Sequence, residues 1–167
     1  MTEAEEPRWL SNDEQGWWLS FISVTTWLPD ALDAQLQRDA GLSHFEYVVL
    51  AMLSMSPQRT RRMSEVAALA NGSLTRLSRV VDRLEKRGWV TRRPDPGDGR
   101  YTLATLTDAG WDKVVAAAPG HVAEVRRLVF DRLTKAQARQ LGELSARIEH
   151  GVRPGGCPAI LPTTDQP

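Results

Sequence analysis

The sequence has a single cysteine and no long apolar segment. Cys157 is the only cysteine in 167 residues, so no disulfide can form within one chain and packing must hold the fold together. No apolar run approaches the roughly 18 residues that a membrane-spanning helix requires, and the acidic start, 1–6, lacks the charge pattern of a secretory leader. We therefore expect a cytoplasmic protein with no membrane partner.

Sequence patterns typical of catalysis or of metal binding are also missing. The chain contains no glycine-rich phosphate loop and no nucleophile elbow. His121 and Glu124 form one i, i+3 pair, while His44 and His150 lie far from it in sequence. For His150 we expect a place in the last turn of a helix, where a cation complements the helix dipole. The sequence thus predicts no enzyme, no cofactor and no metal site.

Charge is unevenly distributed along a chain whose composition is that of one globular domain. Hydrophobic residues make up 41% and charged residues 25%, and the net charge is zero. Residues 57–101, however, hold eleven Lys and Arg against five Asp and Glu, a net +6, which leaves −6 for the rest. A basic segment of this kind is typical of nucleic-acid binding.

Apolar spacing predicts helices at both ends of a single domain over about 12–150. The first helix is expected over about 12–40, with a kink near Leu28 because Pro29 lies inside it. The last two helices are expected over about 108–150, the earlier one bent or broken at Pro119, the later one starting at a capping box. We expect a flexible arm at 1–11 and, because proline and glycine are frequent there, a disordered tail at 151–167.

Short helices and a hairpin are predicted between these ends, over about 43–106. A capping box at Ser43 and Glu46 starts one helix, 56–62 forms a polar connection, and Ser64 caps a short helix to about residue 70. The turn at 71–73 then leads into a helix that ends near Gly88. Its apolar stripe has the spacing i, i+3, i+4, i+7 and comprises Leu77, Val80, Val81 and Leu84.

Two short helices joined by a tight turn and followed by two strands form a winged helix-turn-helix. The predicted strands are 89–93 and 101–106, so the predicted class is mostly α with a small β-hairpin wing. The face opposite the apolar stripe has hydroxyl and guanidinium groups, which suit a DNA major groove. These side chains are Thr75, Arg76, Arg79 and Arg83.

The stretch RRPDPGDGRY, 92–101, would form the tip of the wing and reach the neighbouring minor groove. We expect Arg100 to be the inserted side chain, oriented by Asp98, with Arg92 and Arg93 on phosphate. The complete set of candidate DNA-binding residues is Ser73, Thr75, Arg76, Ser78, Arg79, Arg83, Arg92, Arg93, Asp98 and Arg100.

Two other interpretations of this surface remain open. Arginines on exposed helix faces are usually just solvated. A winged helix can also serve as a protein–protein interaction module without direct DNA readout, in which case apolar side chains are expected on the exposed face.

Residues 73–110 resemble the recognition helix, wing and following turn of the MarR family of bacterial transcription regulators. The resemblance rests on Ser-Arg-x-Val-Asp-x-Leu-Glu-x-x-Gly at 78–88, Asp-x-Arg at 98–100 and Leu-Thr-x-x-Gly at 106–110. It implies a triangular homodimer whose first and last two helices interlock, with two winged domains on a pseudo-palindromic operator in double-stranded DNA. It also implies a repressor that a small lipophilic, phenolic or carboxylate effector releases.

Such effectors bind between the dimerisation helices and the winged domain in the family. The residues where the resemblance places pocket walls are Trp17, Trp18, Trp27, His44 and Tyr47. Thiol sensing as in some relatives is not expected, because no cysteine precedes Cys157. The apolar residues of 128–148 offer more helical surface than one protomer of this length easily covers, which independently favours a symmetric dimer.

Overall fold

The computed structural model of the chain describes residues 7–152. Its elements follow the order α1 (Asn12–Ala40), α2 (His44–Ser54), β1 (Thr60–Arg62), α3 (Met63–Leu69), α4 (Leu74–Lys86), β2 (Val90–Asp95), β3 (Asp98–Leu106), α5 (Asp108–Leu128) and α6 (Lys135–Val152). Short 3-10 turns occupy Pro57–Arg59 and Phe130–Arg132. The predicted mostly helical winged fold is confirmed.

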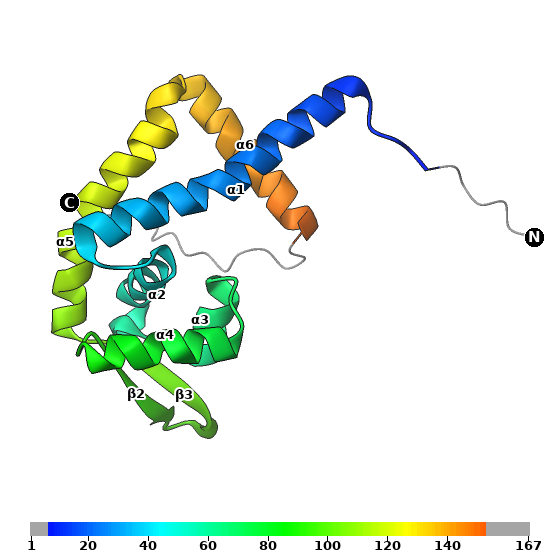
Figure 1. Cartoon of the computed structure of the whole chain (residues 1–167). Coiled ribbons are helices and arrows are strands. Elements are labelled where there is room, and N and C mark those ends of the chain that lie inside the picture. Colours follow the sequence, from blue (N-terminus) through cyan, green and yellow to red (C-terminus); the bar gives the residue numbers. More distant parts are fainter. Residues whose placement is uncertain (1–6, 153–167) are drawn as a thin grey trace, which may run out of the picture.

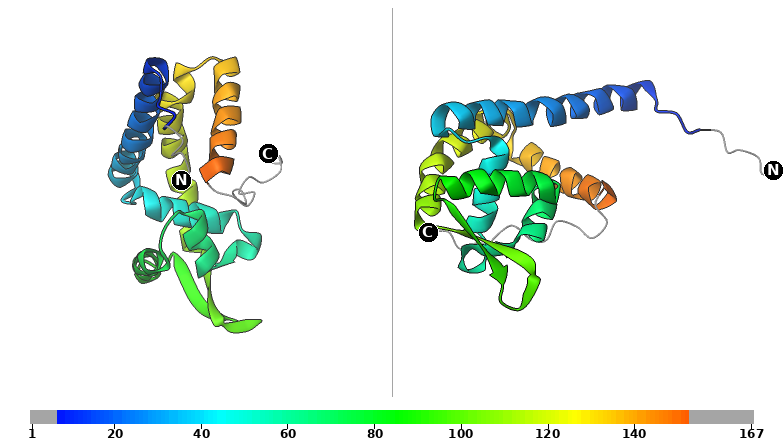
Figure 2. Two further views of the ribbon diagram at one scale, coloured as in Figure 1. Left: turned by 90° about the vertical axis from the view of Figure 1, so that its right-hand side faces the viewer. Right: turned by 60° about the horizontal axis from the view of Figure 1, so that its bottom comes forward.

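The molecule has two ends with different elements (Figures 1 and 2). Helices α1, α5 and α6 lie at one end, and α2, α3, α4 and the hairpin lie at the other, with α2 and α1 each contacting α5. The amino-terminal part of α1 extends past the body of the protomer. The hairpin projects from the opposite end, beside α4, so that α4 and the wing can meet one partner together.

Side-chain caps fix the starts of the helices. Ser43 and Glu46 form a complete capping box, and a second complete box at Ser11 and Glu14 starts α1. At α6 the Thr134 hydroxyl accepts from the Gln137 backbone N–H, as the sequence predicts. The prediction for Ser64 is wrong: α3 begins at Met63, one residue after β1, and its N-cap residue makes no side-chain cap.

The wing is a three-stranded antiparallel sheet in the order β1-β3-β2, and its third strand was not predicted. Thr60 pairs with Thr105, and their hydroxyls lie 2.9 Å apart, so part of the expected polar connection forms an edge strand. Only three residues pair there, too few to give the alternating pattern by which strands are predicted.

The two proline-containing helices are continuous. Helix α1 runs through Pro29, and α5 runs through Pro119 without the break that was considered for it. Helix α6 extends to Val152, so the predicted tail begins two residues too early. Residues 1–6 of the predicted arm and 153–167 of the predicted tail, including Cys157, lie outside the described residues.

The core is built around α2, α3, α4 and the sheet. The stripe Leu77, Val80, Val81 and Leu84 is buried, together with Leu50 and Leu53 of α2. The motif at 106–110 explains how α5 joins this core: the Thr107 hydroxyl donates to the Gly88 carbonyl and accepts from the Gly110 N–H. Gly110 has no substitute because an added Cβ would lie 2.1 Å from the Trp89 carbonyl oxygen.

Candidate nucleic-acid interface

Helix α4 turns one face to the core and presents the other to solvent. Its buried stripe faces α2 and the sheet, so Thr75, Arg76 and Arg79 are exposed, and so is Arg83 one turn further on. The Ser73 hydroxyl accepts from the Arg76 backbone N–H at 3.1 Å and caps the helix, which also satisfies that hydroxyl's acceptor role. Ser78 is half-buried between this face and the wing.

Two of the three exposed arginines are oriented by residues of α2. The Arg83 Nε donates to Glu46 Oε1 at 3.1 Å, and the Arg76 guanidinium lies over the Phe45 ring, 4.2 Å from its centroid. Burial alone would raise the pKa of Glu46, but the hydrogen bond from the Ser43 backbone and the Arg83 guanidinium hold that pKa below its ordinary value. The carboxylate is therefore charged at neutral pH and fixes the Arg83 stem.

Arg79 is placed differently from its neighbours. Within residues 7–152 its guanidinium meets no hydrogen-bond acceptor, carboxylate or aromatic ring, and the side chain is exposed. A free fork of five N–H donors on the exposed face of a helix can reach two acceptors on one guanine edge. Of the α4 arginines, Arg79 is thus the best placed to contact a base.

At the base of the wing, Arg92 joins β2 to α4. Its Nη2 lies 2.6 Å from both Glu85 Oε2 and Asp82 Oδ1, and Glu85 also accepts from the Arg92 backbone N–H at 2.8 Å. The hydrogen bond to Glu85 raises the pKa of Arg92. With two carboxylates on one guanidinium, this residue holds the wing against α4 more readily than it neutralises a phosphate. Arg93, one residue on, is exposed.

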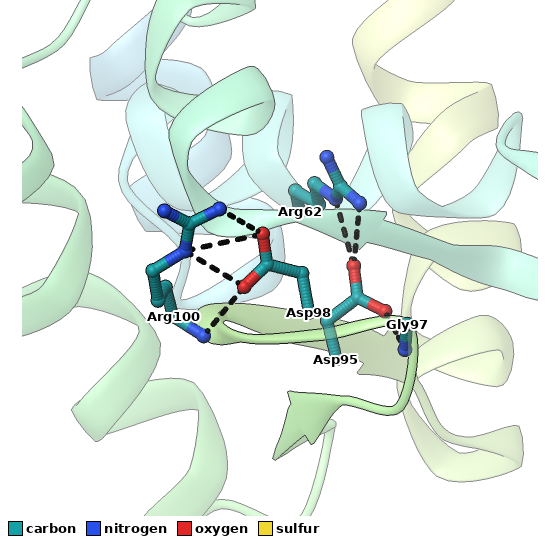
Figure 3. A network of polar contacts seen from close by, with 5 residues as sticks. All are labelled: Arg62, Asp95, Gly97, Asp98 and Arg100. Carbon is teal, nitrogen blue, oxygen red and sulfur yellow. Dashed lines mark hydrogen bonds and ion pairs between the residues drawn. The ribbon is translucent and has the colours of Figure 1, made fainter.

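The tip of the wing holds Arg100 away from the body (Figure 3). Asp98 accepts from Arg100 Nη2 at 2.7 Å and from Arg100 Nε at 2.9 Å, and the Arg100 side chain remains 84% exposed. These hydrogen bonds lower the pKa of Asp98. The predicted pairing is therefore present: one carboxylate orients the arginine and leaves part of its fork free.

A crevice of about 680 Å³ lies beside α4, between it and helices α1 and α2. Its walls include Asp33, His44, Phe45, Arg76 and Arg79. Of the five residues predicted to form an effector pocket, His44 lines this crevice. Tyr47 lies in the core instead, with its ring centroid 4.5 Å from that of His121.

The three predicted pocket tryptophans do not line that crevice. Trp17 and Trp27 are 70% and 68% exposed on α1, and Trp18 is 52% exposed. In one protomer these rings meet solvent, because the first half of α1 extends beyond the helices that could cover it.

The sequence and the fold of this chain are similar to those of known DNA-binding regulators. The model of the MarR family matches residues 40–100. The MarR-family regulator Sco3205 of Streptomyces coelicolor, solved in complex with DNA, is 48% identical, with 90% of this chain and 94% of that chain covered and a TM-score of 0.85. This chain belongs to the MarR family.

Two curated relatives are more distant in sequence. The HTH-type transcriptional regulator YkoM of Bacillus subtilis is 30% identical over 105 residues, which are 62% of this chain and 66% of that protein. The transcriptional repressor MprA of Escherichia coli is 25% identical over 108 residues, 65% of this chain and 61% of that protein. The chain spans less than two thirds of the length of either of these two curated relatives. By name, the first of these relatives is a transcriptional regulator and the second a transcriptional repressor.

Several residues that shape the MarR-type interface escaped the sequence analysis. Glu46, Asp82 and Glu85 orient the arginines described above, and Arg62 with Asp95 forms a second ion pair at the wing, 2.8 Å long. Asp82 and Glu85 are three residues apart on a helix, so the sequence could predict that they share a face. It could not predict that their partner lies on β2. Arg62 lay in the segment expected to be a connection.

Two negative findings apply to residues 7–152. No group of three or more histidine, cysteine or acidic side chains there is placed to hold a metal ion. No helix in the same range has the length and apolar character needed to cross a membrane.

Proposed function

We propose that two copies of this MarR-family chain bind one pseudo-palindromic DNA operator. In each copy α4 enters the major groove and the wing tip enters the adjacent minor groove. One observation carries the proposal: the exposed face of α4 and the extended Arg100 lie on the same end of the protomer, where the hairpin projects beside α4. A recognition helix and a wing at that spacing suit neighbouring grooves of B-form DNA.

Individual residues take distinct roles in this proposal. Arg79 contacts a base, Thr75 contacts a phosphate or a thymine methyl, and Arg93 contacts phosphate. Arg76 and Arg83 bind the backbone in directions set by Phe45 and Glu46. Ser73 and Ser78 line the approach to the helix, while Arg92 keeps the wing at its angle to α4 through Asp82 and Glu85.

The dimer in this proposal is formed by α1, α5 and α6. Exposed apolar side chains follow one face of α6, at Leu141, Leu144 and Ile148, and none of the residues of α6 is buried in the protomer. The first half of α1 is equally uncovered. A two-fold axis would bring these surfaces together and remove them from water, which favours association by about 25 cal/mol per Å² of apolar area buried.

Repression by occupancy and release by an effector complete the proposal. The relative MprA is a repressor by name. The dimer proposed here would repress by covering promoter DNA. A small lipophilic or phenolic ligand suits the crevice beside α4, because Phe45 offers an apolar ring and Arg76 and Arg79 offer cationic donors to a phenolate or carboxylate. A ligand there would occupy the arginines that bind DNA and so favour the free protein.

The same proposal places the domain limits at about 12–150, with the winged helix over about 43–106.

The experiment that tests the function is selection of duplex fragments from a random pool by the purified protein, followed by sequencing. We expect an inverted repeat, and an affinity that falls by roughly 10³ to 10⁵ between 50 and 200 mM salt for 6–10 phosphate contacts. Recovery of unrelated sequences with salt-insensitive binding would contradict the proposal.

A further inference from the structure

We propose that Arg62, a residue of β1 outside both the recognition helix and the hairpin, is a positioning residue that sets the direction of Arg100. The inference rests on the proposed entry of the wing into DNA. It adds a residue that neither the family motifs quoted above nor the charge pattern singles out.

Arg62 holds the first strand of the hairpin at its tip (Figure 3). Its Nε donates to Asp95 Oδ2 at 2.8 Å, its Nη2 forms an ion pair with the same oxygen at 2.8 Å, and the Asp95 side chain is only 11% exposed. The other carboxylate oxygen of Asp95 accepts from the Gly97 backbone N–H at 2.9 Å. Asp95 therefore closes the turn with one oxygen and ties that turn to β1 with the other.

The second strand of the hairpin is held by the same guanidinium. Its central carbon lies 4.4 Å from the centroid of the Tyr101 ring, and Tyr101 directly follows Arg100 on β3. The positive charge of Arg62 also lowers the pKa of Asp98, the carboxylate that orients Arg100. One side chain thus contacts the strand before the tip and the strand after it.

The location of Arg62 makes it a support for the wing more than a DNA contact. It lies on the edge strand, and its backbone pairs with that of Leu103 through the β1–β3 ladder, so its position is fixed by the sheet. Its charge is taken up by Asp95, whereas Arg100 extends from the tip with 84% of its side chain exposed. Arg62 thus links β1 to the tip beyond the register shift at Pro94 and Asp95, where the regular pairing of β2 and β3 is interrupted.

The test is a thermodynamic cycle on the selected operator. Arg62→Met keeps the aliphatic stem and removes the guanidinium, and its affinity is measured by fluorescence anisotropy in the wild-type and Arg100→Ala backgrounds. We expect Arg62→Met to weaken binding by about threefold to tenfold in the first background and to have no effect in the second. Arg62→Lys, which keeps the charge but not the fork, should restore part of the loss.

Two further variants separate positioning from other causes. Asp95→Asn retains an oxygen for the Gly97 N–H and removes the charged partner of Arg62, so it should reproduce the pattern of Arg62→Met. Arg61→Met removes an equal charge from the neighbouring residue of β1, and we expect its effect to be the same in both backgrounds. Hydrogen exchange at the tip amides, 97–101, should become faster in Arg62→Met and stay unchanged in Arg61→Met.

Each result decides the matter. Equal losses in both backgrounds, with a salt slope reduced by about 0.9, would mean that Arg62 contacts a phosphate itself, and would overturn the inference. Full affinity of Arg62→Met would overturn it as well. If Arg100→Ala binds like the wild type, the wing has no role in binding and the proposed function fails at that point. A loss from Arg100→Ala together with additive losses from Arg62→Met overturns the inference about Arg62 alone.

Discussion

The winged part of the molecule buries its apolar side chains, whereas much of the helical part leaves them exposed. Most of the fully buried leucines and valines belong to the elements from α2 to β3. Along the sequence, the residues of the core cluster run from Leu36 to Ala117. The first half of α1 and all of α6 contain no buried residue, although both carry several large apolar side chains. The first part completes its core within one chain, whereas the second part exposes surface that a second chain can cover.

The comparison also shows what an apolar stripe can and cannot predict. The stripe of α4 and the stripe of α6 have the same helical spacing, yet Leu84 is fully buried and Leu144 is 55% exposed. Periodicity shows which face avoids water but not whether the covering surface belongs to the same chain. The predictions below use this difference.

The largest effect is expected from Leu144→Asp. A carboxylate in the proposed α6 interface would be buried without a partner in both copies, at a cost of more than about 3 kcal/mol to the dimer. Analytical ultracentrifugation at micromolar concentration should show monomer. Ala146→Asp adds the same charge two residues away, on the opposite face of the helix, and should remain dimeric. A dimeric Leu144→Asp would contradict the interface.

Leu50→Ala and Leu144→Ala compare the two regions with one substitution. Leu50 is fully buried in the protomer, so its truncation should lower the free energy of unfolding by about 2–5 kcal/mol. The loss should be the same at every protein concentration at which the dimer persists. For Leu144→Ala we expect a loss that grows on dilution, because in the proposed dimer that exposed side chain is covered by the partner. Urea unfolding over a hundredfold range of protein concentration distinguishes the two.

Arg79→Ala tests the exposed face of α4. If its free fork contacts one base pair, discrimination at that operator position should fall by about 1–3 kcal/mol, while other positions keep their preferences. The measurement is competition binding against operators substituted at each position. Lys86→Ala, on the same helix near its end, is the matched loss of one charge and should weaken all operators alike. A uniform loss in Arg79→Ala would assign it to phosphate.

The smallest effect concerns the junction between the two regions. His44 of α2 and His121 of α5 lie with ring centroids 6.1 Å apart, and burial lowers the pKa of each, with the charge of His44 further lowering that of His121. Asp33 opposes this shift at His44. Since the unfolded chain takes up protons at a higher pH than the folded chain, stability should decrease as the pH falls below about 6.5.

His121→Phe isolates that contribution. The substitution keeps a ring against Tyr47 and removes one titrating group, so the decrease in unfolding free energy between about pH 7 and about pH 5 should be shallower than in the wild type. Chemical denaturation at several pH values measures it. An identical pH profile would show that His121 does not contribute. Glu46, whose pKa is lowered, affects stability only at more acidic pH, outside the range of this measurement.

Much of the fold was predictable because local chemistry determines it. The capping boxes at Ser43 and at Thr134, the buried stripe of α4 and the end of that helix at Gly88 each follow from a few neighbouring residues. The pairing of Asp98 with Arg100 was predictable for the same reason, since the two residues are close in sequence.

The remainder depends on contacts between distant segments, which no local pattern encodes. Strand β1 exists because β3 offers it a partner, and Arg62 meets Asp95 across 33 residues. Arg92 was expected on phosphate because its partners, Asp82 and Glu85, belong to a different element. The crevice beside α4 likewise needs residues of three helices, so only His44 of the predicted pocket residues lines it.

The central claim is that α4 and the wing tip engage adjacent grooves of one DNA duplex in two symmetric copies. Hydroxyl-radical footprinting of the selected operator, with wild-type protein and with Arg100→Ala, tests it most directly because these radicals cut through the minor groove. The account predicts two symmetric minor-groove protections flanking the major-groove contacts, both lost in Arg100→Ala. An Arg100→Ala footprint identical to that of the wild type would contradict it.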